Sequence, residues 1–120
     1  MNFFQGQEIK LVNLTPHPIV LRGEDGVEIV LEPSGVIARL ETTYEPQPRG
    51  FVNNIPILVR KPGQLIFEGG IPEGSDDTIF IVSSMVLEAM KAAGYTAASP
   101  DGFIRDDGGR IIAATKLVTI

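Results

Sequence analysis

The single histidine is the residue whose type offers the most chemistry in this chain, which has no cysteine. His17 lies between Pro16 and Pro18, so its imidazole stands in a pre-organised loop. There it could act as a ligand donor, or as a general acid or base near neutral pH. The interpretation we favour is that His17 hydrogen-bonds nearby backbone and fixes the loop, as Asn13 and Thr15 would.

Two adjacent serines, Ser83 and Ser84, follow a short apolar run and precede a segment with helical periodicity. Free N–H groups and the helix dipole make such a helix N-terminus attractive to an anion. A serine oxygen at this position also commonly caps the helix, and we favour capping alone. No G-x-S-x-G sequence surrounds either serine, which argues against a covalent serine enzyme.

Three arginines could bind a carboxylate or phosphate group through paired hydrogen bonds. Arg39 lies on the polar side of an alternating segment, and Arg105 and Arg110 flank an acidic, glycine-containing turn. The simpler interpretation is that they cover solvated strand faces. Arg105 or Arg110 would then pair across the turn with Asp106 or Asp107.

Neither glycine-rich segment of the chain matches a cofactor or metal motif. Residues 69–74 lack the spacing of a phosphate-binding loop, and residues 106–109 lack the ligand spacing of a calcium loop. A hairpin turn explains the second segment fully. We therefore expect no cofactor and no metal site.

Composition is that of one soluble globular domain spanning residues 1–120, with 43% apolar and 21% charged residues. The net charge of −5 argues against general nucleic-acid binding, which needs a basic face. No apolar run is long enough to cross a membrane and no signal peptide is recognisable, so we expect a cytoplasmic protein.

Short apolar runs separated by turn signals predict a mainly β (α+β) fold. We expect a small antiparallel β-barrel or sandwich of about seven to nine short strands, with one helix near 83–93. Val86, Met90 and Ala93 would form the apolar stripe of that helix, and Gly94 would end it. We expect residues 95–100 to be a connection. Strands are expected at 8–14, 19–21, 27–31, 36–43, 51–52, 55–60, 64–67, 78–82, 103–105 and 110–118.

Four stretches, taken in order, resemble a family of small uncharacterised proteins found in bacteria and in phages or prophages. They are N-L-T-P-H-P at 13–18, P-S-G-V-I-A-R at 33–39, I-V-S-S at 81–84 and R-D-D-G-G-R at 105–110. The resemblance names no activity. This chain departs from the family pattern in having alanines at 113 and 114, where the resemblance leads us to expect a glycine. The resemblance implies that certain polar residues gather in one place, namely Asn13, Thr15, His17, Ser34, Arg39, Ser83, Arg105 and Asp106.

Two functions follow as hypotheses. The first is a non-enzymatic, phage-related domain that binds a small anionic, nucleotide-like ligand between the His17 loop and the helix N-terminus. Such a ligand could be a host signal that the domain sequesters. The alternative is a structural or interaction subunit of a homo-oligomer, which would hide exposed edges. A hydrolase pairing His17 with a carboxylate is not favoured. The candidate ligand-binding residues are Asn13, Thr15, His17, Ser34, Arg39, Ser83, Ser84, Arg105 and Asp106, and the candidate edge residues are Phe3, Phe4, Phe51, Phe67 and Ile120.

Overall fold

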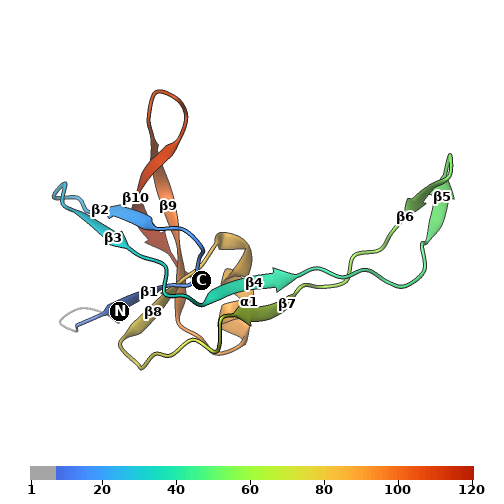
Figure 1. Cartoon of the computed structure of the whole chain (residues 1–120), viewed down its shortest axis with the longest axis horizontal. Helices are drawn as coiled ribbons and strands as arrows, with labels where there is room; N and C mark the ends of the chain where they lie inside the picture. The colour runs from blue at the N-terminus through green and yellow to red at the C-terminus, as the bar shows by residue number, and fades with distance from the viewer. Residues whose placement is uncertain (1–7) are drawn as a thin grey trace.

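A computed structural model describes residues 8–120, so the candidate edge residues Phe3 and Phe4 lie outside the described part. Within it the chain forms ten strands, one 3-10 helix and one short α-helix (Figure 1). The strands are β1 Lys10–Asn13, β2 Ile19–Arg22, β3 Glu28–Leu31, β4 Ile37–Glu41, β5 Gly50–Val52, β6 Ile55–Ile57, β7 Gln64–Glu68, β8 Thr78–Ile81, β9 Ala97–Arg105 and β10 Ile111–Val118; the helices are η1 Ser84–Val86 and α1 Leu87–Ala92.

Six strands form one strongly curved sheet in the order β1-β8-β9-β10-β2-β3. A parallel bridge between Asn13 and Pro33 brings the two ends of this sheet together, which makes it nearly closed and barrel-like. The expected mainly β fold with a single α-helix is therefore confirmed for the described residues. The pairing is mixed, because β1–β8, β8–β9 and β10–β2 are parallel, whereas β9–β10 and β2–β3 are antiparallel.

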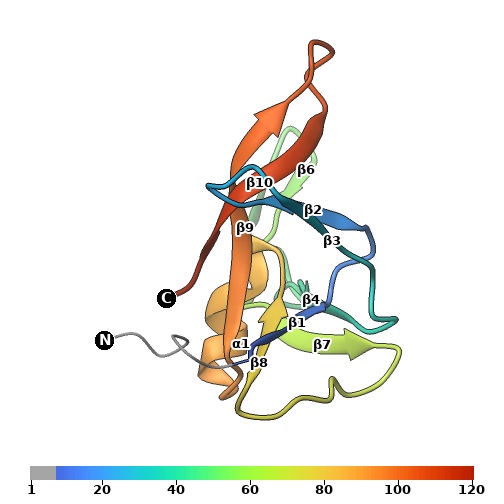
Figure 2. The same ribbon diagram turned by 90° about the vertical axis from the view of Figure 1, so that its left-hand side faces the viewer.

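The central strand β8 is buried along its whole length, as its apolar, β-branched sequence predicts. One cluster of core side chains lies between this strand and the helices and includes Leu14, Val82 and Met90, all fully buried. The helices cover this side of β8 and β9 (Figure 2). Gly94 follows α1 with a φ of +90°, the left-handed conformation that ends helices.

The expectation that residues 95–100 form a connection is wrong for most of that segment. Residues 97–100 begin β9, where Ala97 and Ala98 pair in parallel with Phe80 and Ile81 of β8. Both alanines are buried. Small side chains let the strand lie beneath neighbouring layers, and a run of small residues carries no alternation from which a strand can be predicted.

A second feature is a long two-stranded extension. β4 and β7 pair on the body, and the chain between them runs outward as a ribbon that ends in the β5–β6 hairpin (Figure 1). We call residues 43–61 the arm and the other described residues the body. The radius of gyration is 17.8 Å, against about 13.6 Å for a compact chain of this length. The arm therefore projects well clear of the body.

Candidate functional site

A large hollow lies on the body between the loop at His17, the start of η1 and the β9–β10 pair. Its volume is about 1000 Å³. Polar side chains line it at Thr15, His17, Ser83, Ser84 and Ser99, acidic side chains at Glu88 and Asp101, and larger apolar side chains include Ile19, Met85, Leu87, Phe103, Ile111, Val118 and Ile120.

Parallel pairing explains why the His17 loop and the serines share this hollow. β1 and β8 lie side by side in the same direction, with Asn13 opposite Ile81. Chain segments that leave two neighbouring parallel strands emerge at the same end of the sheet. Thr15 and His17 therefore come out beside Ser83, although they are far apart in the sequence.

Three polar side chains at this end of the hollow are free to bind another molecule. His17, Ser83 and Ser84 are all exposed, and their side chains form no hydrogen bond with any other residue in the range 8–120. Ser83 occupies the N-cap position of η1 with φ −67° and ψ 154°, but its hydroxyl caps no N–H group. The favoured interpretations of capping by serine and of a bracing His17 imidazole are therefore wrong, and these donors are open to a ligand.

Asn13 holds the His17 loop in place. Its buried amide nitrogen donates to the carbonyl oxygens of His17 at 2.8 Å and Leu31 at 3.0 Å. Its amide oxygen accepts from the Thr15 N–H at 2.9 Å and from the Thr15 hydroxyl at 2.7 Å. One buried side chain thus ties three segments together, as the bracing interpretation predicts for Asn13 and Thr15.

Ser34 and Arg39 do not line the hollow. The Ser34 N–H donates to the Asn13 carbonyl at 3.0 Å, and the Ser34 hydroxyl accepts from the Val36 N–H at 3.2 Å within the same turn. Arg39 forms an exposed ion pair of 2.6 Å with Glu68 across β4 and β7. Ser34 thus stabilises a turn, and Arg39 joins the two strands from which the arm extends.

Arg105 and Asp106 form the turn of the β9–β10 hairpin, which stands away from the rest of the body (Figure 1). The Asp106 carboxylate accepts from the N–H groups of Gly108 and Arg110, each at 2.9 Å. The Arg105 guanidinium donates to the Gly109 carbonyl at 2.8 Å. The expected ion pair across this turn does not form between residues of the described range, because backbone groups satisfy both side chains.

The structure therefore separates the residues that the resemblance groups together. Thr15, His17, Ser83 and Ser84 line the hollow, with Asn13 just behind it. The two candidate ligand-binding arginines, Arg39 and Arg105, lie elsewhere, and the charged residues that line the hollow are acidic. The apolar wall, which includes Phe103 and Ile111, was not predicted as part of a site, because each of these residues fits an ordinary strand pattern next to a turn.

No cluster of three or more His, Cys, Asp or Glu side chains in residues 8–120 could hold a metal ion. None of the helices in the described range has the length and apolar character required to cross a membrane. Comparisons with protein-family models, curated proteins and solved structures found no match.

Proposed function

We propose that this protein is a non-enzymatic binding module whose hollow takes a small, nucleotide-like molecule. The observation that supports this most directly is the set of uncommitted polar side chains of His17, Ser83 and Ser84 beside a largely apolar wall. Small-molecule sites are commonly hollows of roughly 300–1000 Å³ with apolar linings and a few polar groups that fix orientation.

The lining suits a ligand with two kinds of surface. Phe103 and Ile111 offer an apolar face for a planar ring. The imidazole and the two serine hydroxyls can donate hydrogen bonds to an anionic group. Glu88 and Asp101 can accept hydrogen bonds from amino or hydroxyl groups. A nucleotide carries all three kinds of group.

The biological setting is a further part of the proposal. The resemblance to a phage and prophage family supports a role in sequestering a nucleotide-type signal of the host. Such a signal would be met in the cytoplasm. Sequestration requires binding alone, which fits a site with a single histidine and neither cysteine nor a nearby lysine or arginine.

A thermal-shift screen of the full chain against nucleotides, cyclic nucleotides and sugar phosphates tests this function. A ligand at about 100 times its Kd should add about 2.7 kcal/mol to the free energy of unfolding. We expect the shift to be lost in His17→Ala and Ser83→Ala, and to be retained in Arg39→Ala and Arg105→Ala.

Two results would count against the proposal. One is a screen in which no compound raises the melting temperature of the folded protein. The other is a shift that disappears in Arg105→Ala and survives in His17→Ala, since that would place the anion at the β9–β10 turn and not in the hollow.

A second candidate function is a subunit of a homo-oligomer, and the arm is the observation that favours it. Its exposed apolar side chains include Phe51, which is 67% exposed. The two functions are compatible, because the arm contributes no residue to the lining of the hollow.

A further inference from the structure

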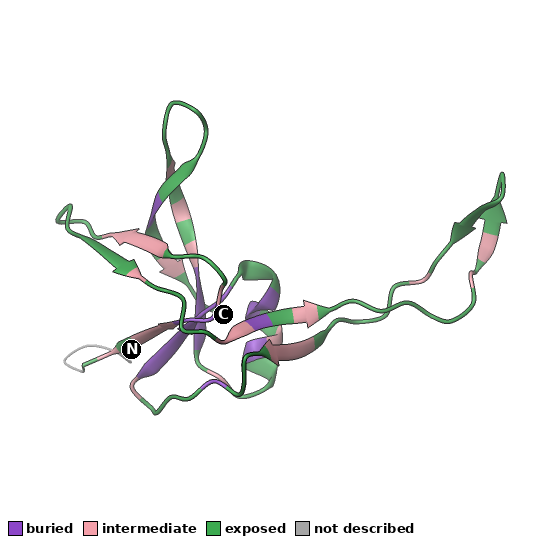
Figure 3. Ribbon diagram, in the orientation of Figure 1, coloured by how far each residue is buried: buried purple, intermediate pink, exposed green. Residues whose placement is uncertain are grey.

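The arm is a well-formed ribbon with no interior. Its two strands are joined by backbone hydrogen bonds at regular intervals, from Lys61 N–H to Thr43 at the base to Arg49 N–H to Ile57 near the tip. At the tip Asn53 and Asn54 have φ values of +51° and +66°, as in the tight turn that suits a twisted hairpin. None of its residues is buried (Figure 3).

The tip of this ribbon is apolar. Phe51 and Ile55 expose 67% and 65% of their surface, and Val52, Ile57 and Leu58 are also exposed. Contiguous apolar side chains on a projecting element are rare on a protein that works alone, and they mark surfaces that another molecule covers. An isolated two-stranded hairpin is also marginally stable in water, so a covering partner would stabilise the ribbon itself.

A second exposed apolar surface lies along β3. Within residues 8–120 this strand pairs with β2 and with no other strand along Glu28–Leu31, so one of its edges keeps unpaired backbone groups. Val27, Ile29 and Val30 on and beside this strand are 61%, 48% and 55% exposed. We call this strand and these three side chains the β3 edge. Such an edge can pair with a further strand.

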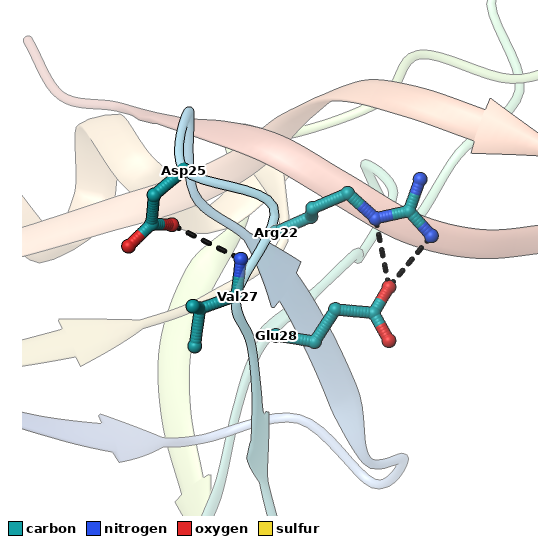
Figure 4. Close-up of polar contacts among 4 residues, drawn as sticks. All are labelled: Arg22, Asp25, Val27 and Glu28. Atoms are coloured by element: carbon teal, nitrogen blue, oxygen red, sulfur yellow. Dashed lines mark hydrogen bonds and ion pairs between the residues drawn. The ribbon is translucent and has the colours of Figure 1, made fainter.

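The two surfaces carry opposite charge. The arm holds three basic residues and one acidic residue, a net charge of +2, whereas residues 19–32 around the β3 edge hold one basic and four acidic residues, a net charge of −3. The one basic residue, Arg22, forms an ion pair of 2.6 Å with Glu28 (Figure 4). The carboxylates of Glu24, Asp25 and Glu32 form no ion pair within residues 8–120, although that of Asp25 accepts a hydrogen bond from the Val27 N–H, and their charges can attract the arm.

We propose that the arm of one copy docks on the β3 edge of a second copy of this chain and adds the β5–β6 hairpin to its sheet. Strand addition would satisfy the free backbone groups and bury both sets of apolar side chains together. Like charges disfavour contact between two arms or between two β3 edges. This proposal rests on the second candidate function, a subunit of a homo-oligomer. Neither the hollow nor its ligand enters it, so its failure would leave the proposed ligand binding untouched.

The placement of the two surfaces determines the kind of assembly. The arm and the β2–β3 hairpin lie at opposite ends of the molecule (Figure 1). Contacts between different surfaces on opposite ends are head-to-tail, and they generate a closed ring or an open chain instead of a pair with exchanged arms. Each copy then offers one arm and receives one.

Light scattering of the full chain and of four variants tests this proposal. Two variants alter the proposed contact, one is a control outside it, and one lies in the hollow. We expect the wild-type protein to have a mass of several 13.0 kDa chains. The arm variant Phe51→Asp/Ile55→Asp and the edge variant Val30→Lys should each have the mass of one chain, because each introduces a charge that its docking surface repels. Ile71→Asp, at an equally exposed apolar residue outside both surfaces, should assemble like the wild type.

Mixing gives the sharpest outcome. The arm variant keeps an intact β3 edge and the edge variant keeps an intact arm, so equal amounts of the two should form a species of two chains that grows no further. Thermal unfolding of each variant alone verifies that its body is folded.

Three outcomes would overturn the proposal. They are a wild-type protein that stays a single chain at high concentration, a mixture of the two variants that stays at one chain, and an edge variant that still assembles. If Met85→Asp, in the hollow, disrupts assembly while Val30→Lys does not, the arm is seated in the hollow and the β3 edge is the wrong site.

Discussion

The body and the arm are both built from short strands, but they differ in what surrounds those strands. In the body, β8 is buried on both faces, and Leu14, Ile81 and Val82 have no exposed surface. In the arm, β5 and β6 are paired just as regularly, and no side chain is buried. Backbone pairing therefore gives a ribbon its shape, whereas the burial of side chains is what stabilises a ribbon.

Polar contacts also differ in burial. Asn13 is buried, and its amide links the His17 loop to β3. Arg39 and Glu68, on the β4–β7 pair from which the arm extends, form an ion pair that is about half exposed on both sides. Buried hydrogen bonds are costly to break, whereas exposed ion pairs contribute about 0–1 kcal/mol.

The largest expected effect is in the core of the body. Leu14→Ala removes a fully buried side chain from the cluster between β8 and the helices, and should lower the free energy of unfolding by about 2–5 kcal/mol. Urea unfolding followed by circular dichroism measures the loss. A loss below about 1 kcal/mol would mean that the body collapses around the cavity, and the contrast with the arm would weaken.

The second largest effect is expected for the buried amide of Asn13. Asn13→Ala leaves the carbonyl groups of His17 and Leu31 and the N–H group of Thr15 without this partner, and should cost about 1–3 kcal/mol. The same urea experiment measures this loss, with Ser84→Ala as the exposed control. The Ser84 hydroxyl forms no hydrogen bond within residues 8–120, so we expect a change within about 0.5 kcal/mol. Equal losses for the two variants would contradict the role assigned to Asn13.

In the arm, truncation of an apolar side chain should leave stability almost unchanged. For Phe51→Ala and Ile57→Ala we expect changes within about 0.5 kcal/mol, because neither side chain is buried in a single chain. Unfolding must be followed at a dilution at which the protein is a single chain, since assembly would add stability. A loss as large as that of Leu14→Ala would show that the arm folds back onto the body.

The smallest effect concerns pH. A hydrogen bond from the Ser75 hydroxyl, aided by the charge of Lys10, holds the pKa of the Asp77 carboxyl below its ordinary value of 3.8. Because the pKa is lower in the folded state, this group stabilises the protein fully above pH 3.8, and the stabilisation is lost as pH falls through the folded pKa.

The variant Asp77→Asn isolates this contribution. Its melting temperature should lie slightly below that of the wild type near neutral pH, and the difference should vanish in acid. A difference that stays constant below pH 3.8 would show that the contact acts through packing and not through charge.

Much of the body could be predicted from local patterns. The β-branched run of β8 and the helix that follows it have unambiguous periodicity, and the Asp25-Gly26 pair identifies the β2–β3 hairpin. What local patterns do not contain is the partner of each strand. The parallel pairing of β1 with β8 joins distant segments, so no local pattern favours it over an antiparallel pairing.

For the candidate site, residue type indicates which side chains could bind a ligand, but it does not predict where those side chains lie in the fold. Arg105 and Asp106 have the chemistry of an anion site, but the hairpin turn uses both of them. His17 and Ser83 share a hollow because of a parallel strand pair, which a single sequence does not reveal. The arm was missed as a unit because Pro56 weakens the strand pattern on one side of the Asn53-Asn54 turn.

The β1–β8 pair also bears on how the chain is made. Lys10 pairs with Thr78, and the whole arm is synthesised between them. During synthesis β1 therefore cannot pair until β8 has emerged from the ribosome. The arm, whose pairing is entirely local, can form as soon as residue 61 has emerged. The nascent chain would then display its apolar tip before the body exists to carry it. The arm of one nascent chain could therefore meet the equally local β2–β3 hairpin of a neighbour on the same messenger before either chain is complete.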